Sequence, residues 1–155
     1  MTSVANPYAE YKKTQVETAS PEKLVLMLYD GAIKFLVQAK IKMSRKDKDG
    51  KQVEEISYSI KRARAIINEL AITLDMKNGG DMAKNLLFLY EFMLNQLTTA
   101  DIDLDVLPVD RVIGMVKELR EAWLEVIKVY NSQKDEKEIP SGDNIHKEKR
   151  FYAAV

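Results

Sequence analysis

The sequence predicts an all-α protein: an antiparallel up-down-up-down four-helix bundle, with an N-terminal extended segment or short turn and a polar C-terminal tail. Four stretches carry apolar residues that alternate three and four apart, which is the spacing of one helix face. Short breaks separate these stretches, and short connections between long helices favour antiparallel neighbours. The chain has 155 residues, 46% of them hydrophobic, which suits one globular domain. We expect a mobile N-terminal segment at residues 1–19, the bundle at residues 20–131 and a flexible tail at residues 132–155.

The first two helices have clear starts and stripes. Ser20 precedes Pro21, which places a capping hydroxyl before a proline at the first helical position. The charged run at residues 46–50 separates this helix from the second one. The expected core stripes are Val25, Leu28, Ala32, Phe35 and Ala39 on the first helix, and Val53, Ile56, Ile60, Ala63, Ile67, Leu70 and Leu74 on the second.

The third and fourth helices follow two further turns. Residues 78–81 read Asn-Gly-Gly-Asp, a turn whose last residue, Asp81, is expected to cap the third helix. A turn around residues 101–108 leads to the fourth helix, and the chain becomes polar from Asn131 onward. The expected core stripes are Leu86, Tyr90, Met93, Leu97 and Ala100 on the third helix, and Val109, Val112, Val116, Leu119, Trp123, Val126 and Tyr130 on the fourth.

Composition argues against most catalytic and binding chemistries. Lys plus Arg and Asp plus Glu both number 24, so the net charge is +0 and nucleic acid is not an expected partner. The chain has no cysteine, and its single histidine, His146, lies in the polar tail. We therefore predict no catalytic residues, no metal site and no cofactor. No apolar run is long enough to cross a membrane and the start does not resemble a secretion signal, so we expect a cytosolic protein without membrane insertion.

Apolar residues outside the core stripes indicate a surface that binds another protein, which we call the client. On the second helix such residues recur every seven positions on the side away from the stripe, and on the third helix two phenylalanines lie off the stripe. The first helix is apolar nearly all round, so part of its apolar surface must be buried by something other than the neighbouring helices. Surplus apolar surface of this kind marks a partner site or a segment of the same chain folded over it. The predicted client-binding residues are Tyr58, Ala65, Ile66, Ile72, Phe88, Phe92, Leu24, Tyr29 and Ile33.

Other interpretations of these residues stay open at this point. Each off-stripe residue could be ordinary packing, because small bundles are not perfect heptads. The chain could also be a self-associating structural bundle that buries these stripes against a second copy, although a monomer is favoured. A metal protein or enzyme that uses only carboxylates is a third alternative. The acidic residues lie mostly on outward faces and the core stripes contain none, which argues against it.

Five stretches of the chain together carry a family pattern. Asn6-Pro7-Tyr8, Tyr11 and Val16-Glu17-Thr18-Ala19-Ser20-Pro21-Glu22-Lys23-Leu24 lead into Leu28-Tyr29-Asp30-Gly31-Ala32-Ile33. Further stretches are Ile66-Ile67-Asn68-Glu69-Leu70 with Leu74-Asp75, Leu89-Tyr90 with Met93, and Leu119-Arg120-Glu121-Ala122-Trp123. Over roughly residues 5–130 the chain closely resembles the flagellar secretion chaperone FliS family. The block from Ser-Pro to Leu-Tyr-Asp-Gly is specific for that family.

The resemblance implies a function and partners. Members of the family are cytosolic four-helix bundles that bind the disordered C-terminal region of flagellin. They keep flagellin from polymerising prematurely and deliver it to the flagellar type III export gate. The resemblance thus implies a one-to-one complex with flagellin. The family's mobile N-terminal segment corresponds to residues around Tyr8 and Tyr11, which we expect to form a lid over part of the client site. The tail from residue 131 is longer than a minimal bundle requires and reads Phe151-Tyr152-Ala153-Ala154-Val155 at residues 151–155.

Overall fold

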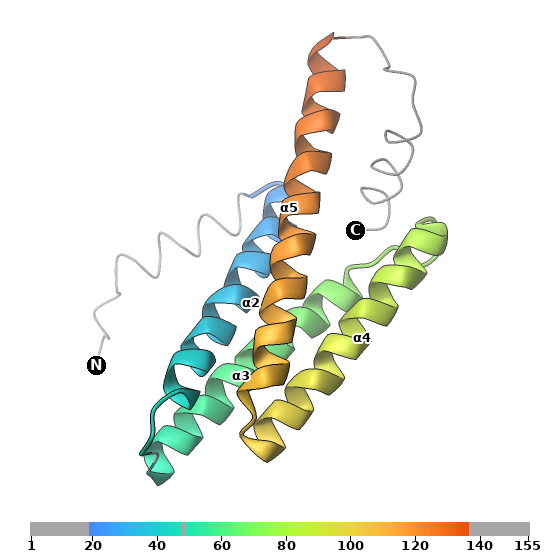
Figure 1. The fold of residues 1–155 in the computed structure, drawn as a ribbon. Helices are drawn as coiled ribbons and strands as arrows, with labels where there is room; N and C mark the ends of the chain where they lie inside the picture. Colours follow the sequence, from blue (N-terminus) through green and yellow to red (C-terminus); the bar gives the residue numbers. More distant parts are fainter. Residues whose placement is uncertain (1–18, 48, 137–155) are drawn as a thin grey trace, which may run out of the picture.

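The helices of the structure contact one another in chain order and close into a ring. The computed structural model describes residues 19–47 and 49–136 (Figure 1). Its helices are α2 (Pro21–Met43), α3 (Gly50–Ile72), α4 (Gly80–Asp103) and α5 (Val106–Glu136). Each helix packs against the next, and α5 returns to pack against α2. The predicted all-α antiparallel bundle is confirmed within these residues, and α5 continues past residue 131, where the sequence placed the end of the bundle.

Side-chain caps begin α2 and α3. The Ser20 hydroxyl oxygen accepts a hydrogen bond from the backbone N–H of Lys23 at 3.4 Å, and Pro21 occupies the first turn, as predicted. The Asp49 carboxylate accepts a hydrogen bond from the backbone N–H of Gln52 at 2.8 Å. Each cap satisfies an N–H group that has no partner inside its own helix.

The start of α4 differs from the prediction. The expectation that Asp81 caps this helix is wrong, because Asp81 already lies in the first turn and Gly79 occupies the capping position. Gly80 has a φ of 59°, a left-handed conformation that glycine adopts without steric cost. The turn is held instead by the Asp75 carboxylate, which accepts hydrogen bonds from the backbone and side-chain nitrogens of Asn78 at 2.9 and 3.1 Å. These bonds, the backbone one first, hold the pKa of Asp75 below its ordinary value.

The connection between α4 and α5 is shorter than predicted. We expected a turn over residues 101–108, but α4 continues to Asp103 and α5 begins at Val106. Leu104 ends α4 in the left-handed conformation, with a φ of 51°. The Asp105 carboxylate then accepts a hydrogen bond from the backbone N–H of Leu107 at 3.0 Å. Leu104 and Asp105 alone therefore reverse the chain.

The core is built largely from the predicted stripes on α3, α4 and α5. Its largest side chain is Trp123, whose indole N–H donates a hydrogen bond to the backbone carbonyl of Glu22 at 2.9 Å and so links α5 to the start of α2. Other buried apolar residues of these helices include Ile56, Ile60, Ala63, Ile67, Leu70, Ala83, Leu86, Met93, Leu97, Ala100, Val109, Val112, Val116 and Val126.

The buried stripe on α2 differs from the prediction. We expected Leu28 and Phe35 to face the core, but both are only half-buried, and Tyr29 and Leu36 are fully buried in their place. Because α2 is apolar nearly all round, its own pattern does not determine which side is buried. The structure buries the side whose tyrosine hydroxyl finds a hydrogen-bond partner in the core, which a buried polar group requires.

That partner belongs to α4, so a tyrosine pair links α2 and α4 across the core. The hydroxyl oxygens of Tyr29 and Tyr90 lie 2.6 Å apart, and both side chains are fully buried. Burial raises the pKa of Tyr29 to about 12 and also raises the pKa of Tyr90. Both phenols are therefore neutral near pH 7, and each satisfies the hydrogen-bonding need of the other.

The next two residues of α2 contact the remaining helices. The Asp30 carboxylate pairs with Nε of Arg120 on α5. Gly31 faces α3, where a Cβ added to it would lie 3.2 Å from Cδ1 of Ile66. The absence of a side chain at Gly31 therefore lets α2 approach α3 closely. Three successive residues, 29–31, thus contact α4, α5 and α3 in turn.

Removing one hydroxyl of the tyrosine pair should weaken the bundle. Tyr90→Phe is expected to lower the free energy of unfolding by about 1–3 kcal/mol, because the Tyr29 hydroxyl would stay buried without a partner. Urea unfolding followed by circular dichroism measures this change.

The matched control removes both hydroxyls and keeps both rings. Tyr29→Phe with Tyr90→Phe leaves no unsatisfied hydroxyl, so this double variant is expected to be more stable than either single variant. A double variant less stable than both single variants would contradict this account of the pair.

Candidate functional site

The outer side of α3 carries the exposed apolar residues that the sequence predicts. Tyr58 is 61% exposed, Ile72 is 67% exposed, and Ala65 between them is exposed as well. Their seven-residue spacing places all three on one side of the helix, opposite the buried Ile60 and Ile67. We call Tyr58, Ala65 and Ile72 the α3 face.

The outer side of α4 carries two exposed phenylalanines. Phe88 is 70% exposed and Phe92 is 38% exposed. They lie four residues apart, hence on one side of the helix, and away from the buried Tyr90 and Met93. We call Phe88 and Phe92 the α4 face. Since α3 and α4 are neighbours in the bundle (Figure 1), two adjacent helices present apolar surface to solvent.

The other predicted client-binding residues are covered to different degrees. The prediction that Tyr29 lies on the binding surface is wrong, because this side chain is 0% exposed and its hydroxyl is bonded inside the core. Ile33 and Ile66 are half-buried and pack against the core, and Leu24 is half-buried. The strongly exposed part of the predicted surface therefore lies on α3 and α4.

Cations flank a half-buried aromatic ring on α2. The Arg62 guanidinium lies 5.5 Å from the centroid of the Phe35 ring, and the Lys34 ammonium lies 5.7 Å from it. The negative face of an aromatic ring attracts a cation at this range. Arg62 comes from α3, so this contact covers part of the Phe35 ring, which also packs against the core.

Exposed apolar residues also occur outside the predicted binding surface. Ile102 is 76% exposed and Leu107 is 64% exposed, and both lie in the segment predicted as a turn. Apolar side chains inside a predicted turn were the signal that could have identified them. The remaining members of this group are Ile41, Met76 and Leu104.

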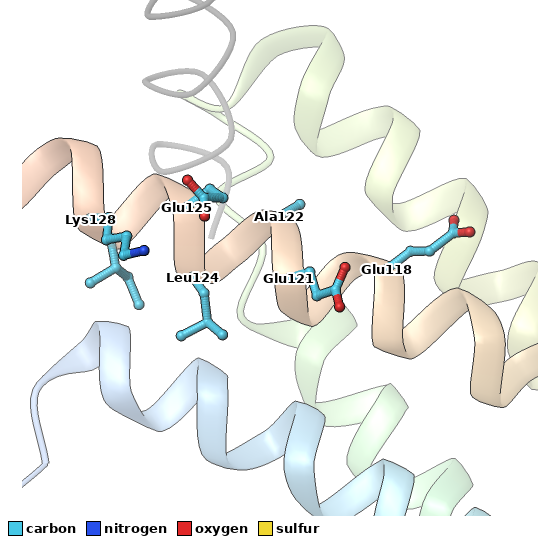
Figure 2. Close-up of a pocket in the computed structure, with 7 residues that line it drawn as sticks. Glu118, Glu121, Ala122, Leu124, Glu125 and Lys128 are labelled. Atoms are coloured by element: carbon cyan, nitrogen blue, oxygen red, sulfur yellow. The ribbon is translucent and has the colours of Figure 1, made fainter.

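A shallow depression lies along α5 (Figure 2). Its described lining combines three carboxylates with apolar side chains, and in Figure 2 Leu124 points toward α2 while Glu125 points away from it. The carboxylates lie on an outward face, as expected of the acidic residues from the sequence. The lining residues are Glu118, Glu121, Ala122, Leu124, Glu125, Ile127 and Lys128.

Two kinds of site are absent from the part of the chain that the structure describes. Across residues 19–47 and 49–133, no three His, Cys, Asp or Glu side chains are grouped so that they could hold a metal ion. In the same residues, no helix combines the length and the hydropathy that crossing a bilayer requires. The predicted lid residues Tyr8 and Tyr11, and His146, lie outside the described residues.

Comparison with known proteins identifies the family. The family described as Flagellar protein FliS matches residues 4–130. The chain belongs to the FliS family. It is similar to a flagellar secretion chaperone FliS of Vibrio cholerae, at 38% identity over 126 residues, which cover 79% of this chain and 89% of that protein. The FliS of Campylobacter jejuni is 36% identical over 119 residues (77% and 89%), and the FliS of Bacillus subtilis is 30% identical over 125 residues (81% and 89%).

The stretches that resemble FliS meet one another in the fold. Asp30, in the Leu-Tyr-Asp-Gly block, pairs with Arg120, which belongs to the last of the five stretches. Trp123 of the same stretch bonds to the carbonyl of Glu22, which follows the Ser-Pro pair. Residues from the stretches that resemble FliS therefore connect α2 with α5.

Charged substitutions should distinguish the α3 face from the core. Tyr58→Glu with Ile72→Glu is expected to change stability by less than about 1 kcal/mol, because exposed positions tolerate charge. Ile67→Glu is expected to cost more than about 4 kcal/mol, because it buries an unpaired carboxylate. Thermal melts followed by circular dichroism compare the two variants. If the outer pair melts as low as Ile67→Glu, the α3 face is part of the core.

Proposed function

We propose that this FliS-family protein is a cytosolic flagellar secretion chaperone that binds the disordered C-terminal region of flagellin in a one-to-one complex. The proposal rests on the family match over residues 4–130 and on relatives whose names describe flagellar secretion chaperones. Binding keeps flagellin from polymerising prematurely, and the complex then reaches the flagellar type III export gate. The role is binding rather than catalysis, and it requires no cofactor.

Exposed apolar side chains supply the free energy that such binding needs. A disordered client loses conformational entropy when it binds, so apolar burial must offset that loss. Fully burying one large apolar side chain stabilises a complex by about 1.5–3 kcal/mol. Tyr58, Ile72 and Phe88 are each more than half exposed in the free bundle and are available for this purpose.

The placement of the two faces favours a client that wraps around the bundle. The α3 face and the α4 face lie on the outer sides of adjacent helices, so a client that covers both must pass from one helix to the next. Extended client segments can follow this path, and helical segments can place anchors at helical spacing against each face. The core need not open, because the proposed contacts are already at the surface.

Removing the client's C-terminal segment should abolish binding. Isothermal titration with full-length flagellin is expected to give a one-to-one complex, and titration with flagellin that lacks its C-terminal segment is expected to give no measurable heat of binding. If the truncated flagellin binds as tightly as the full-length protein, the proposal is wrong. Light scattering of the free protein accompanies this test, since a stable dimer would favour the structural-bundle alternative.

Substitutions on the α3 face then locate the binding surface. Tyr58→Glu with Ile72→Glu is expected to weaken binding at least about 100-fold, because two buried contacts are lost. The matched control is Ile41→Glu with Ile102→Glu, which adds the same charge to exposed apolar residues at the end of the bundle where α2 and α4 finish. Equal losses of affinity in the two variants would rule out the α3 face as the specific site.

We further propose that the segment around Tyr8 and Tyr11 is a lid over part of the client site. It carries two tyrosines before the first helix of the bundle. An aromatic side chain gains free energy when it covers exposed apolar surface. A lid that competes with the client lowers the apparent affinity by the fraction of molecules that are closed.

Deleting residues 1–15 tests the lid. The deletion is expected to speed association with flagellin and to increase the binding of an apolar dye to the free protein. Stopped-flow fluorescence measures the association rate. An unchanged or slower rate would eliminate the lid, and faster dissociation with weaker binding would show that the tyrosines contact the client directly.

A further inference from the structure

The outer side of α5 carries a ridge of like charge. Glu118, Glu121 and Glu125 are all exposed, and their spacing of three and four residues places them on one side of the helix. Among residues 19–47 and 49–133, no lysine, arginine or histidine forms an ion pair with any of these carboxylates. Glu121 and Glu125 are four residues apart, an arrangement in which like charges repel. A cation placed beside this ridge would relieve that repulsion.

Apolar side chains lie beside the ridge. Ala122, Leu124 and Ile127 line the same depression as the three glutamates, and Lys128 lies at its edge (Figure 2). Leu124 and Ile127 are only half-buried in the bundle. A complementary partner for this depression would therefore combine positive charges with large apolar side chains.

Residues 147–152 of this chain have that combination. They read Lys-Glu-Lys-Arg-Phe-Tyr, with three positive charges against one negative charge, followed directly by two aromatic rings. The described part of the structure ends before this segment, at residue 136 of α5, the same helix that carries the depression. The basic segment is opposite in charge to the acidic ridge. Its two aromatic rings are apolar, like the side chains on the floor of the depression.

The chain between them is long enough to bring them together. From Glu136 back to Glu121 along α5 is about 22 Å at the rise of a helix. Residues 137–146 can span up to about 33 Å when extended. They include the Pro-Ser-Gly sequence at 140–142, which permits the chain to reverse direction.

We propose that residues 147–152 dock onto the outer side of α5 of their own chain. Lys147, Lys149 and Arg150 face the glutamate ridge, and Phe151 and Tyr152 cover the apolar floor of the depression. This contact leaves the α3 face and the α4 face free. It does not depend on the proposed function, since it involves only residues of this chain.

Cysteine cross-linking in the full chain tests the proposal. Because the chain has no cysteine, two introduced thiols report a single contact. Ala122→Cys with Ala153→Cys is expected to form an intramolecular disulfide at least about tenfold faster than Ala65→Cys with Ala153→Cys, because docking raises the effective concentration of the thiols. Ala65 is the matched control, since it is an exposed alanine on the outer side of α3. Equal rates would overturn the proposal, and disulfide-linked dimers would show that the segment docks on a second copy instead.

Charge reversal in the cross-linking variant tests the recognition itself. Lys147→Glu with Lys149→Glu and Arg150→Glu should slow disulfide formation between positions 122 and 153 to the rate measured for the control pair, positions 65 and 153. Adding Glu121→Lys and Glu125→Lys should restore the fast reaction, because the two sides are then complementary again. High salt should slow the reaction of the unreversed chain by screening the charges. A rate of disulfide formation that changes with neither the charge reversal nor the salt concentration would contradict the proposed contact.

Discussion

The buried tyrosine pair fixes the register of the bundle, and the two residues that follow Tyr29 on α2 contact the remaining helices. The hydroxyls of Tyr29 and Tyr90 lie 2.6 Å apart, and this buried bond can form in only one register of α2 against α4. Gly31 lies against α3, where a Cβ would be tight against Ile66, and Asp30 pairs with Arg120 of α5 at the surface. Purely apolar stripes could slide by a turn at small cost, whereas these three contacts are satisfied together in one arrangement.

The residues that resemble FliS and lie between helices are different from the exposed residues that are proposed to bind the client. Residues 29–31, Arg120 and Trp123 belong to the stretches that resemble FliS, and they are engaged between helices. The exposed apolar side chains lie instead on the outer sides of α3 and α4. A client can therefore attach to a surface that already exists in the free protein, which lowers the cost of ordering the chaperone itself.

The fold was predictable because periodicity is a local signal, whereas parts of the site depend on contacts between distant residues. Four stripes were enough to predict the helices and most of the core, and the heptad spacing of Tyr58, Ala65 and Ile72 identified an outer face. The sequence of α2 could not show that Tyr29 turns inward, since its partner Tyr90 lies 61 residues away. The cap of α4 was misplaced for a related reason: the Asp75 carboxylate, which precedes the turn, holds it through Asn78, and Gly80 adopts a left-handed conformation at the start of the helix.

The unequal lengths of the helices have a dynamic consequence. With 31 residues, α5 is longer than α2, which has 23, and it extends beyond the start of α2 in Figure 1. The indole of Trp123 is bonded to the first turn of α2, and the described side chains of α5 after Val126 are half-buried or exposed. Local opening there disrupts backbone hydrogen bonds but none of the fully buried contacts that Val112, Val116 and Trp123 make in the middle of the helix. Amide hydrogen exchange along α5 should therefore form a gradient, slowest around Val116 and fastest toward Glu136, so that this helix unravels from its far end while the bundle stays folded.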